Sequence, residues 1–235
     1  MSFVHSALVL GLSSALLAGC SAYPVMKEDT VRRTAMPVFM LERDIPGQLF
    51  MFESRERVYK KYAPATLYIE GDGMPYVSVD AVNSDPTPED PVALRLAAQD
   101  SSPNVIWIAR PCQYNKSWSK GGACPSEYWT SKRFAPEVID DYETALDNIK
   151  SRYGITSFNL VGYDGGAAIA SILAAKRSDI LSLRTVAGNL DPKTTAVLHK
   201  VGYSEDSLSP VDFAPGLANI PQRHFLGKMD RFTPP

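Results

Sequence analysis

The chain has 235 residues, of which 24 are Lys or Arg and 26 are Asp or Glu, so its formal net charge at pH 7 is −2. Because the basic residues are scattered and do not outnumber the acidic ones, the composition excludes the positive field that nucleic-acid binding requires. The charged cluster RERVYKK at residues 55–61 is predicted to form a solvated face.

The N-terminal region has the pattern of an export signal. Residues 6–18, SALVLGLSSALLA, form an uncharged apolar run too short to span a bilayer comfortably, and small residues and a cysteine follow it. The LAGC stretch that ends at Cys20 resembles the bacterial lipobox, in which cleavage precedes the cysteine and the thiol carries the lipid. No Lys or Arg precedes the apolar run, whereas export signals usually start positively charged. A plain signal peptide and an anchoring helix are therefore the alternatives.

This resemblance divides the chain into three parts. We expect a lipoprotein signal peptide at residues 1–19, a polar tether at residues 20–36 and one domain at residues 37–235. Lipidation at Cys20 implies a membrane as partner, and Ser21 would suit retention at the outer membrane, facing the periplasm. The sequence predicts no oligomeric state.

The two remaining cysteines predict a cross-link. With Cys20 lipidated, Cys112 and Cys124 form an even pair in an oxidising compartment, which predicts a disulfide closing CQYNKSWSKGGAC. Two free buried thiols are the alternative. The spacing lacks the paired Cys and His residues of a zinc site, and we predict no metal and no cofactor.

The first half of the domain combines short apolar runs with turns. Pro46 and Gly47 form a turn-favouring pair between two apolar runs in VFMLERDIPGQLFMFES, which predicts a leading hairpin. The near-continuous apolar runs at residues 65–70 and 104–109 predict parallel strands covered on both faces. Between them, NSDPTPEDP supplies loop and helix-start signals before a helix at VALRLAAQ.

The second half alternates strands and helices. Apolar side chains recur at steps of three and four over residues 136–153, which predicts an amphipathic helix with Pro136 in its first turn and Gly154 at its end. SFNLVG, LSLRTVAG and RHFLG predict three further strands, and the apolar GAAIASILAAKR predicts a buried helix between the first two. This alternation indicates an α/β fold with a parallel sheet and right-handed crossovers.

Three motifs, which occur in the expected order along the chain, resemble those of the α/β-hydrolase superfamily over residues 60–235. GYDGG (162–166) matches G-x-S-x-G except at its centre, EGDG (70–73) stands where that fold keeps its oxyanion loop, and GKMDRFTP (227–234) resembles the acid loop. The combination of YIEGDG, RPCQY, YWTSKRF and VAGNLD further resembles a group of secreted bacterial α/β-hydrolase lipoproteins. The resemblance implies a three-layer α/β sandwich with a mostly parallel sheet.

The resemblance also assigns roles to residues. Asp164 stands at the nucleophile position, on a sharp strand-to-helix turn whose flanking glycines avoid collisions, and Asp230 would be the acid that orients a histidine. The N–H of Gly165 and one from the loop after residue 69 would form the oxyanion hole. The loop candidates are Gly71, Asp72 and Gly73. A simple turn is the alternative for EGDG, and an ordinary loop carboxylate is the alternative for Asp230.

The histidine of the triad has no obvious counterpart. It normally lies beyond the acid, whereas the sequence ends at Pro235, five residues after Asp230. We therefore expect the last strand, the last helix and the catalytic histidine of the fold to be absent. His5 lies in the signal, His199 in a predicted helix, and His224 in the final strand, where we predict a core residue rather than a base.

Asp164 is also a poor candidate for the nucleophile. Haloalkane dehalogenases and epoxide hydrolases of this fold use aspartate there, together with a histidine-activated water, but their motif resembles H-D-W-G whereas GYDGG keeps serine-type surroundings. Attack by a carboxylate on an ester would give an anhydride, and the fixed charge would oppose the developing oxyanion. We predict that aspartate suits the turn but catalyses poorly.

Two functions are consistent with these observations. The first is a secreted hydrolase of small carboxylic esters or lipids, with little or no activity in this chain. The alternative is a binding or scaffolding lipoprotein, a pseudoenzyme that uses the pocket without chemistry. The sequence does not identify the substrate.

If Cys20 carries the lipid, Cys20→Ala will leave the precursor uncleaved and alter its partitioning into membranes, because acyl chains and not the polar tether supply the affinity. Mass spectrometry of the N-terminus and membrane fractionation measure the two effects. Ser21→Ala, which keeps the thiol, is the matched control for cleavage. Normal processing and unchanged partitioning of the cysteine variant would refute the assignment.

Overall fold

The computed structural model describes residues 27–78, 80–115, 123–200 and 203–233. The predicted signal peptide and the lipidation site at Cys20 lie outside the described residues. Within these ranges, no helix combines the length and the apolar character that a membrane crossing requires.

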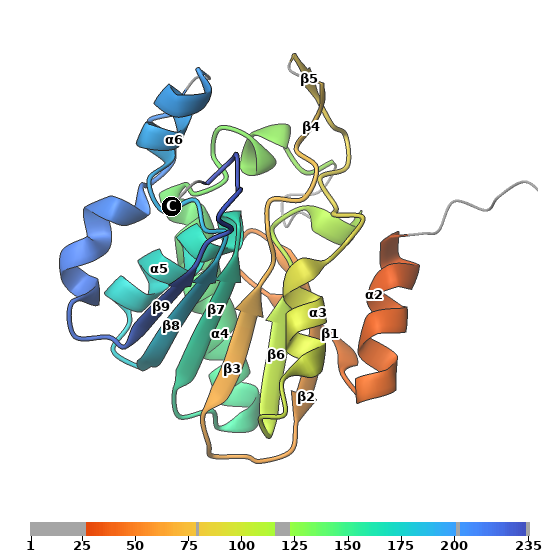
Figure 1. The fold of residues 1–235 in the computed structure, drawn as a ribbon. Helices are drawn as coiled ribbons and strands as arrows, with labels where there is room; N and C mark the ends of the chain where they lie inside the picture. Colours follow the sequence, from red (N-terminus) through yellow and green to blue (C-terminus); the bar gives the residue numbers. More distant parts are fainter. Residues whose placement is uncertain (1–26, 79, 116–122, 201–202, 234–235) are drawn as a thin grey trace, which may run out of the picture.

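The described residues contain one large sheet of seven strands: β1 (Leu41–Pro46), β2 (Met51–Val58), β3 (Ala65–Ile69), β6 (Asn104–Ile108), β7 (Phe158–Tyr163), β8 (Ile180–Val186) and β9 (Gln222–Phe225). Their order is β1-β2-β6-β3-β7-β8-β9 (Figure 1). The strands from β6 to β9 run parallel, and the β1–β2 hairpin is antiparallel to β6. The predicted mostly parallel sheet is confirmed.

Helices cover both faces of this sheet. The longer helices are α2 (Lys27–Ala35), α3 (Val92–Gln99), α4 (Pro136–Tyr153), α5 (Gly165–Lys176) and α6 (Pro192–His199). Apolar side chains of α4 and α5 pack with one set of strand residues, which includes Leu67 and Ile106, whereas those of α2 and α3 pack with Tyr68 and Trp107. The result is the predicted three-layer sandwich. Burial on both faces explains why β3 and β6 are continuously apolar.

Smaller elements lie outside these layers. They are the paired strands β4 (Tyr76–Ser78) and β5 (Ala81–Val82), and the 3-10 helices η1 (Met36–Val38), η2 (Gln113–Asn115), η3 (Ser126–Trp129) and η4 (Pro210–Leu217). In Figure 1, β4, β5 and α6 extend beyond the ends of the central strands from which the loops of the site emerge.

The predicted leading hairpin is confirmed, and a buried carboxylate holds its turn. Asp141 of α4 accepts hydrogen bonds from the backbone N–H groups of Gln48 (2.6 Å), Leu49 (2.9 Å) and Phe50 (2.8 Å). A Cβ atom on Gly47 would lie 2.1 Å from Asp141 Oδ2, so this turn residue has no room for a side chain. The turn therefore depends on a residue more than ninety positions away.

The predicted tether at residues 20–36 is wrong for its second half, because residues 27–35 form α2. Val31 and Ala35 of this helix are fully buried against α3 and its neighbouring strands. Its acidic residues lie in the first turn and its basic residues in the last, which favours a helix through the macrodipole. Asp29 forms ion pairs with Arg32 (2.5 Å) and Arg33 (2.9 Å).

The solvated face predicted at residues 55–61 is also wrong at its start. Arg55, Glu56 and Arg57 are buried because β2 lies between β1 and β6 rather than at an edge. Their charges have partners: Arg55 pairs with Glu53, and Glu56 pairs with Arg152 of α4 at 3.0 Å. The stretch becomes exposed only beyond the strand, at residues 59–61.

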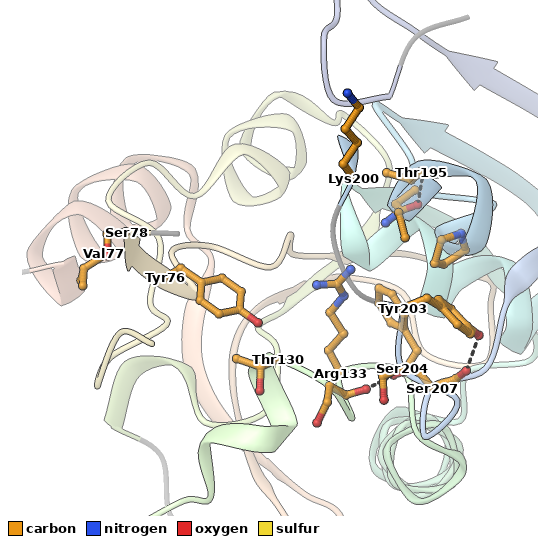
Figure 2. Close-up of a pocket in the computed structure, with 15 residues that line it drawn as sticks. Tyr76, Val77, Ser78, Thr130, Arg133, Thr195, Lys200, Tyr203, Ser204 and Ser207 are labelled. Atoms are coloured by element: carbon orange, nitrogen blue, oxygen red, sulfur yellow. Dashed lines mark hydrogen bonds between the residues drawn. The ribbon is translucent and has the colours of Figure 1, made fainter. Parts of the chain in front are cut away.

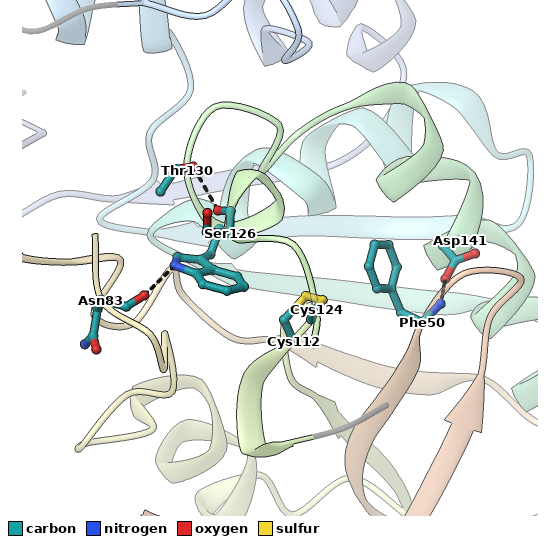
Figure 3. The surroundings of a disulfide bond; sticks show 8 residues. Phe50, Asn83, Cys112, Cys124, Ser126, Thr130 and Asp141 are labelled. Atoms are coloured by element: carbon teal, nitrogen blue, oxygen red, sulfur yellow. Dashed lines mark hydrogen bonds between the residues drawn. A yellow bond between two sulfur atoms is a disulfide. The ribbon is translucent and has the colours of Figure 1, made fainter. Parts of the chain in front are cut away.

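The predicted disulfide between Cys112 and Cys124 is present, with Cα atoms 5.9 Å apart, and Figure 3 shows it beside η3. It joins the loop after β6 to the start of the segment that carries η3. Trp129, the last residue of η3, donates its indole N–H to the carbonyl of Asn83 at 3.0 Å. The cross-link therefore helps to fix a segment that goes on to form one wall of a cavity.

Replacing both cysteines, Cys112→Ala with Cys124→Ala, should lower the free energy of unfolding by about 3 kcal/mol, the value expected for opening a loop of about 13 residues. Urea unfolding with and without a reductant measures the change. The reductant should destabilise the unmodified chain and leave the double variant unaffected. Equal unfolding midpoints for the unmodified chain and the double variant, both measured without reductant, would contradict the prediction.

Candidate active site

The centre of the site is the turn between β7 and α5, which carries Asp164. Its backbone has φ 49° and ψ −120°, a conformation that costs energy for a residue with a side chain. Two backbone hydrogen bonds hold it: Asp164 N–H donates to the carbonyl of Val186 and its own carbonyl accepts from Ala167, both at 3.0 Å. The predicted sequence of strand, sharp turn and helix is therefore present.

The loop after β3 reaches the same place because β3 and β7 are parallel neighbours. Glycines allow the close approach of the two segments. A Cβ atom on Gly166 would lie 2.3 Å from the carbonyl oxygen of Glu70, and one on Gly165 would lie 1.9 Å from Asp72 Oδ1. The flanking glycines of the motif thus have the steric role that the sequence predicted.

Two backbone N–H groups act on the carboxylate of Asp164. That of Asp72 donates a hydrogen bond to Asp164 Oδ2 at 3.0 Å, and that of Gly165, the next residue, lowers the pKa of the carboxyl group. These are the groups that the sequence predicted as oxyanion donors, one from each segment. In this structure the donor from the loop after β3 is hydrogen-bonded to the side chain of Asp164.

The other two residues of the predicted oxyanion loop are directed elsewhere. Gly71 packs against the turn, and its N–H donates to Glu70 Oε1 at 2.9 Å rather than toward Asp164. Gly73 has φ +73°, and the chain then turns so that Met74 N–H donates to the carbonyl of Pro86. Of the three candidates, the structure brings the N–H of Asp72 to Asp164.

A buried carboxylate anchors the start of this loop. Glu70 is almost fully buried and accepts the indole N–H of Trp107 at 2.9 Å. It also accepts the backbone N–H groups of Ala93 and Leu94 at the first turn of α3, each at 3.3 Å. Burial raises the pKa of Glu70. The loop is therefore tied to α3 and β6 before it reaches Asp164.

Two arginines that the sequence reasoning missed complete the charged cluster. Asp72 accepts a hydrogen bond from Arg110 Nη1 at 2.5 Å and lies 3.4 Å from Arg133 Nε. Arg110 is buried, and its Nη2 donates to the carbonyl of Arg133 at 2.6 Å. Both guanidinium groups contact the ring of Phe134, at 5.3 and 5.1 Å from its centroid. The available signal was the position of Arg110, directly after the buried strand β6.

Burial and the neighbouring charge of Asp72 raise the pKa of Asp164 to about 6. The hydrogen bonds from Asp72 and Gly165 and the charge of Arg133 act in the opposite direction but do not cancel the effect. A carboxyl group with this pKa is mostly ionised at pH 7 and takes up a proton under mildly acidic conditions.

The predicted acid, Asp230, follows β9 and is bound by its own loop. Its carboxylate accepts the N–H groups of Phe232 (2.8 Å) and Thr233 (3.1 Å) and the hydroxyl of Thr233 (3.1 Å). The backbone hydrogen bonds, chiefly that from Thr233, lower the pKa of Asp230. The structure therefore presents Asp230 as an ionised loop carboxylate with no histidine among its described partners.

The two described histidines bind other groups. His199 Nε2 lies 2.9 Å from the carbonyl oxygen of Phe232, and His224 Nδ1 lies 2.7 Å from the hydroxyl oxygen of Thr185. The prediction that His224 is a core residue is wrong, because β9 is the edge strand in the described sheet and its residues are exposed. His5 lies outside the described residues.

A cavity of about 860 Å³ opens beside this cluster (Figure 2). Two of the residues that line the cavity also belong to the cluster. Arg133 contacts Asp72, and the backbone nitrogen of Asn189 lies 3.4 Å from the backbone carbonyl oxygen of Asp164. The opposite walls come from β4, from α6 and from residues 203–207. Its volume is in the range of small-molecule sites.

Solved structures share this architecture. A bacterial membrane phospholipase A superposes with a TM-score of 0.52 at 13% identity, covering 97% of this chain and 84% of that one. The chain has the α/β-hydrolase fold. An esterase from Pyrococcus furiosus (TM-score 0.55, 11% identity, 85% of this chain and 76% of that one) and a proposed α/β hydrolase from Agrobacterium tumefaciens (0.51, 19%, 83% and 73%) are also similar. No protein-family model and no curated protein sequence matches the chain.

In the α/β-hydrolase fold the nucleophile lies on the turn that Asp164 occupies, and an oxyanion hole is formed by the N–H after it and one from a preceding strand–helix loop. The structure brings Asp164, Gly165 and Asp72 together in this arrangement. It does not bring Asp230 into contact with a histidine. The catalytic roles of these residues stay predictions.

Asp164→Asn should stabilise the protein at pH 8 by about 2 kcal/mol, because the folded state disfavours the ionised carboxylate. A pKa raised from 3.8 to about 6 means that the folded state binds the proton more tightly, so the unmodified chain loses stability as the pH rises from about 4 to 6. The advantage of the variant should therefore shrink below pH 4. Urea unfolding at both pH values measures it.

Asp230→Asn is the matched control, for which we expect the opposite change in stability at pH 8. The pKa of Asp230 is lowered in the folded state, so its ionised form contributes stability above its unfolded pKa, and the variant should be less stable at pH 8. If Asp164→Asn were also less stable at pH 8, the carboxylate of Asp164 would be a favourable partner of the two N–H groups, contrary to the prediction.

Proposed function

We propose that the chain is a cell-envelope lipoprotein derived from a hydrolase of carboxylic esters or lipids, with little or no ester hydrolysis in its present form. The observation that carries the proposal is the carboxylate of Asp164, which accepts a hydrogen bond from the N–H of Asp72, while the N–H of Gly165 lowers its pKa. A donor that would stabilise an oxyanion is therefore occupied by an anion of the protein itself.

Three physical reasons oppose ester hydrolysis at this site. A negative charge beside the oxyanion position repels the charge that develops there, and losing even one donor costs about 3 to 4 kcal/mol in other enzymes. Attack by a carboxylate on an ester carbonyl gives an anhydride rather than a stable acyl-enzyme. Finally, the described histidines bind Phe232 and Thr185, so neither is in place to activate water at Asp164.

The names of two similar structures support esters or lipids as the ancestral substrate class. One is a membrane phospholipase A and another is an esterase, and both have the same fold as this chain. The membrane attachment rests on the lipobox resemblance at Cys20 and is proposed on that basis alone.

A second candidate function is ligand binding without chemistry, and the cavity favours it. A space of about 860 Å³ lies beside the turn at Asp164, and Arg133 and Asn189 belong both to its lining and to the surroundings of that turn. A pseudoenzyme that retains such a site can still hold the kind of molecule that its walls recognise.

The proposal predicts how a hydroxyl at residue 164 would behave. The unmodified chain should not react with a fluorophosphonate probe, which requires an activated hydroxyl. Asp164→Ser frees the two N–H donors and supplies the hydroxyl but no base, so labelling should be slow and should rise by about tenfold when imidazole is added. Intact-protein mass spectrometry follows labelling, and hydrolysis of p-nitrophenyl butyrate follows turnover.

Asp164→Ala is the matched control, because it frees the same donors without a hydroxyl and should not be labelled even with imidazole. Appreciable ester turnover by the unmodified chain that Asp164→Ala abolishes would overturn the proposal. Asp164 would then be a working nucleophile, and His224 would be the first residue to test as the base.

A further inference from the structure

The cavity beside Asp164 has an unusual charge distribution. The chain as a whole carries slightly more acidic than basic residues, yet none of the described residues that line the cavity is Asp or Glu. The charged lining residues are Arg133 and Lys200, both cations. A wall with this composition favours a ligand that carries negative charge.

Arg133 is held so that it can bind such a ligand. Its Nε lies 3.4 Å from Asp72 and its guanidinium group rests against Phe134, which fixes the plane of the group. Among the described residues, no hydrogen bond involves its terminal nitrogens, although its side chain is only 27% exposed. Figure 2 shows the side chain extending into the space between Tyr76 and Thr195. A guanidinium group presented in this way matches the two oxygens of a carboxylate or a phosphate.

The surrounding hydroxyl groups provide a rigid frame. Tyr203 donates its hydroxyl to the carbonyl of Ser207, and Ser207 donates its own to the carbonyl of Ser131, which fixes that wall. Figure 2 shows the hydroxyl of Tyr76 directed toward the side where Thr130 and Arg133 lie. An anionic head group near Arg133 would therefore meet the hydroxyl of Tyr76 as a neutral donor as well as the cation.

The rest of the wall is apolar. Phe134 lies beside Arg133, and Val77, Pro192 and Ala196 line the cavity together with the rings of Tyr76 and Tyr203. Burying a hydrocarbon chain here is favourable at roughly 25 cal/mol per Å² of apolar surface. The site thus combines an anion-binding end with an apolar end.

We propose that this cavity binds an amphiphilic organic anion, with its carboxylate or phosphate head group on Arg133 and its hydrocarbon body along Val77, Phe134 and Ala196. The inference deepens the second candidate function, ligand binding without chemistry. A neutral ester would give the terminal nitrogens of Arg133 no charged acceptor, whereas an anion pairs with them.

Asp164 should oppose this binding. Asp72 connects the two residues, because its carboxylate lies 3.4 Å from Arg133 Nε and its N–H donates to Asp164, and the charge of Arg133 lowers the pKa of Asp164. With Asp164 ionised, part of the positive charge of Arg133 and Arg110 is already compensated by Asp72 and Asp164. Removing the charge of Asp164 should therefore strengthen the binding of an anion.

Isothermal titration calorimetry with three eight-carbon probes tests the proposal. Octanoate carries a carboxylate, octyl phosphate a phosphate, and 1-octanol no charge. We expect at least one of the anions to bind at least tenfold more tightly than the alcohol, and the preferred anion distinguishes a fatty-acid-like ligand from a phosphate-bearing one. Octanol binding as tightly as both anions, or no binding of either anion, would overturn the proposal.

Variants assign the effect to Arg133. Arg133→Gln should weaken binding of the preferred anion at least tenfold without changing that of octanol, Arg133→Lys should retain part of the affinity, and Asp164→Asn should raise it several-fold. Arg95→Gln, at an exposed arginine of α3 that pairs with Asp90, is the matched control and should change nothing. Circular dichroism verifies that each variant is folded. Full anion affinity in a folded Arg133→Gln protein would exclude Arg133 as the anchor.

Turnover is measured separately, by hydrolysis of p-nitrophenyl butyrate in the same samples. Hydrolysis by the unmodified chain would contradict the proposed lack of ester chemistry but would leave the anion result standing. Loss of anion binding without hydrolysis would contradict only the ligand assignment.

Discussion

The arrangement of the site depends on Asp72, which uses its backbone and its side chain in different directions. Its N–H donates to the carboxylate of Asp164, while its own carboxylate binds Arg110 and contacts Arg133. Asp72 follows β3, Asp164 follows β7, Arg110 follows β6 and Arg133 precedes α4. Asp72 therefore links the loops of three neighbouring parallel strands. Buried charges are stable in such a place only when they are paired and hydrogen-bonded, and Asp72 provides both for the cluster.

Asp164 fits this cluster as a structural residue. The carboxylate of Asp164 accepts the N–H of Asp72, a donor that the shorter side chain of a serine would leave free for a substrate oxygen. The same carboxylate lies near Asp72, and the resulting repulsion and burial raise its pKa to about 6. The turn therefore keeps the shape of a nucleophile site while its electrostatics oppose the formation of an oxyanion.

The cavity is built from segments that lie outside the central layers. Residues 130–134 reach it after η3, which the disulfide between Cys112 and Cys124 ties to the loop following β6, and α6 and residues 203–207 form other walls. The sheet and its glycine-containing turn thus fix the position of Asp164, whereas the cross-linked and helical additions form the walls of the cavity next to it.

The sequence by itself determined the layers, the hairpin, the disulfide and the turn at Asp164, because apolar periodicity, cysteine number and glycine spacing are local or countable signals. Only the tertiary structure decided which charged residues are buried and which partners they have. Glu56 is buried in β2 because Arg152, 96 positions away, neutralises it, and Arg110 belongs to the site because Asp72 lies opposite. A charged side chain prefers water until a distant partner compensates it, so no local pattern reports its burial. For the same reason the sequence predicted that Asp72 and Gly165 lie near Asp164 but could not indicate that the carboxylate of Asp164 accepts the N–H of Asp72.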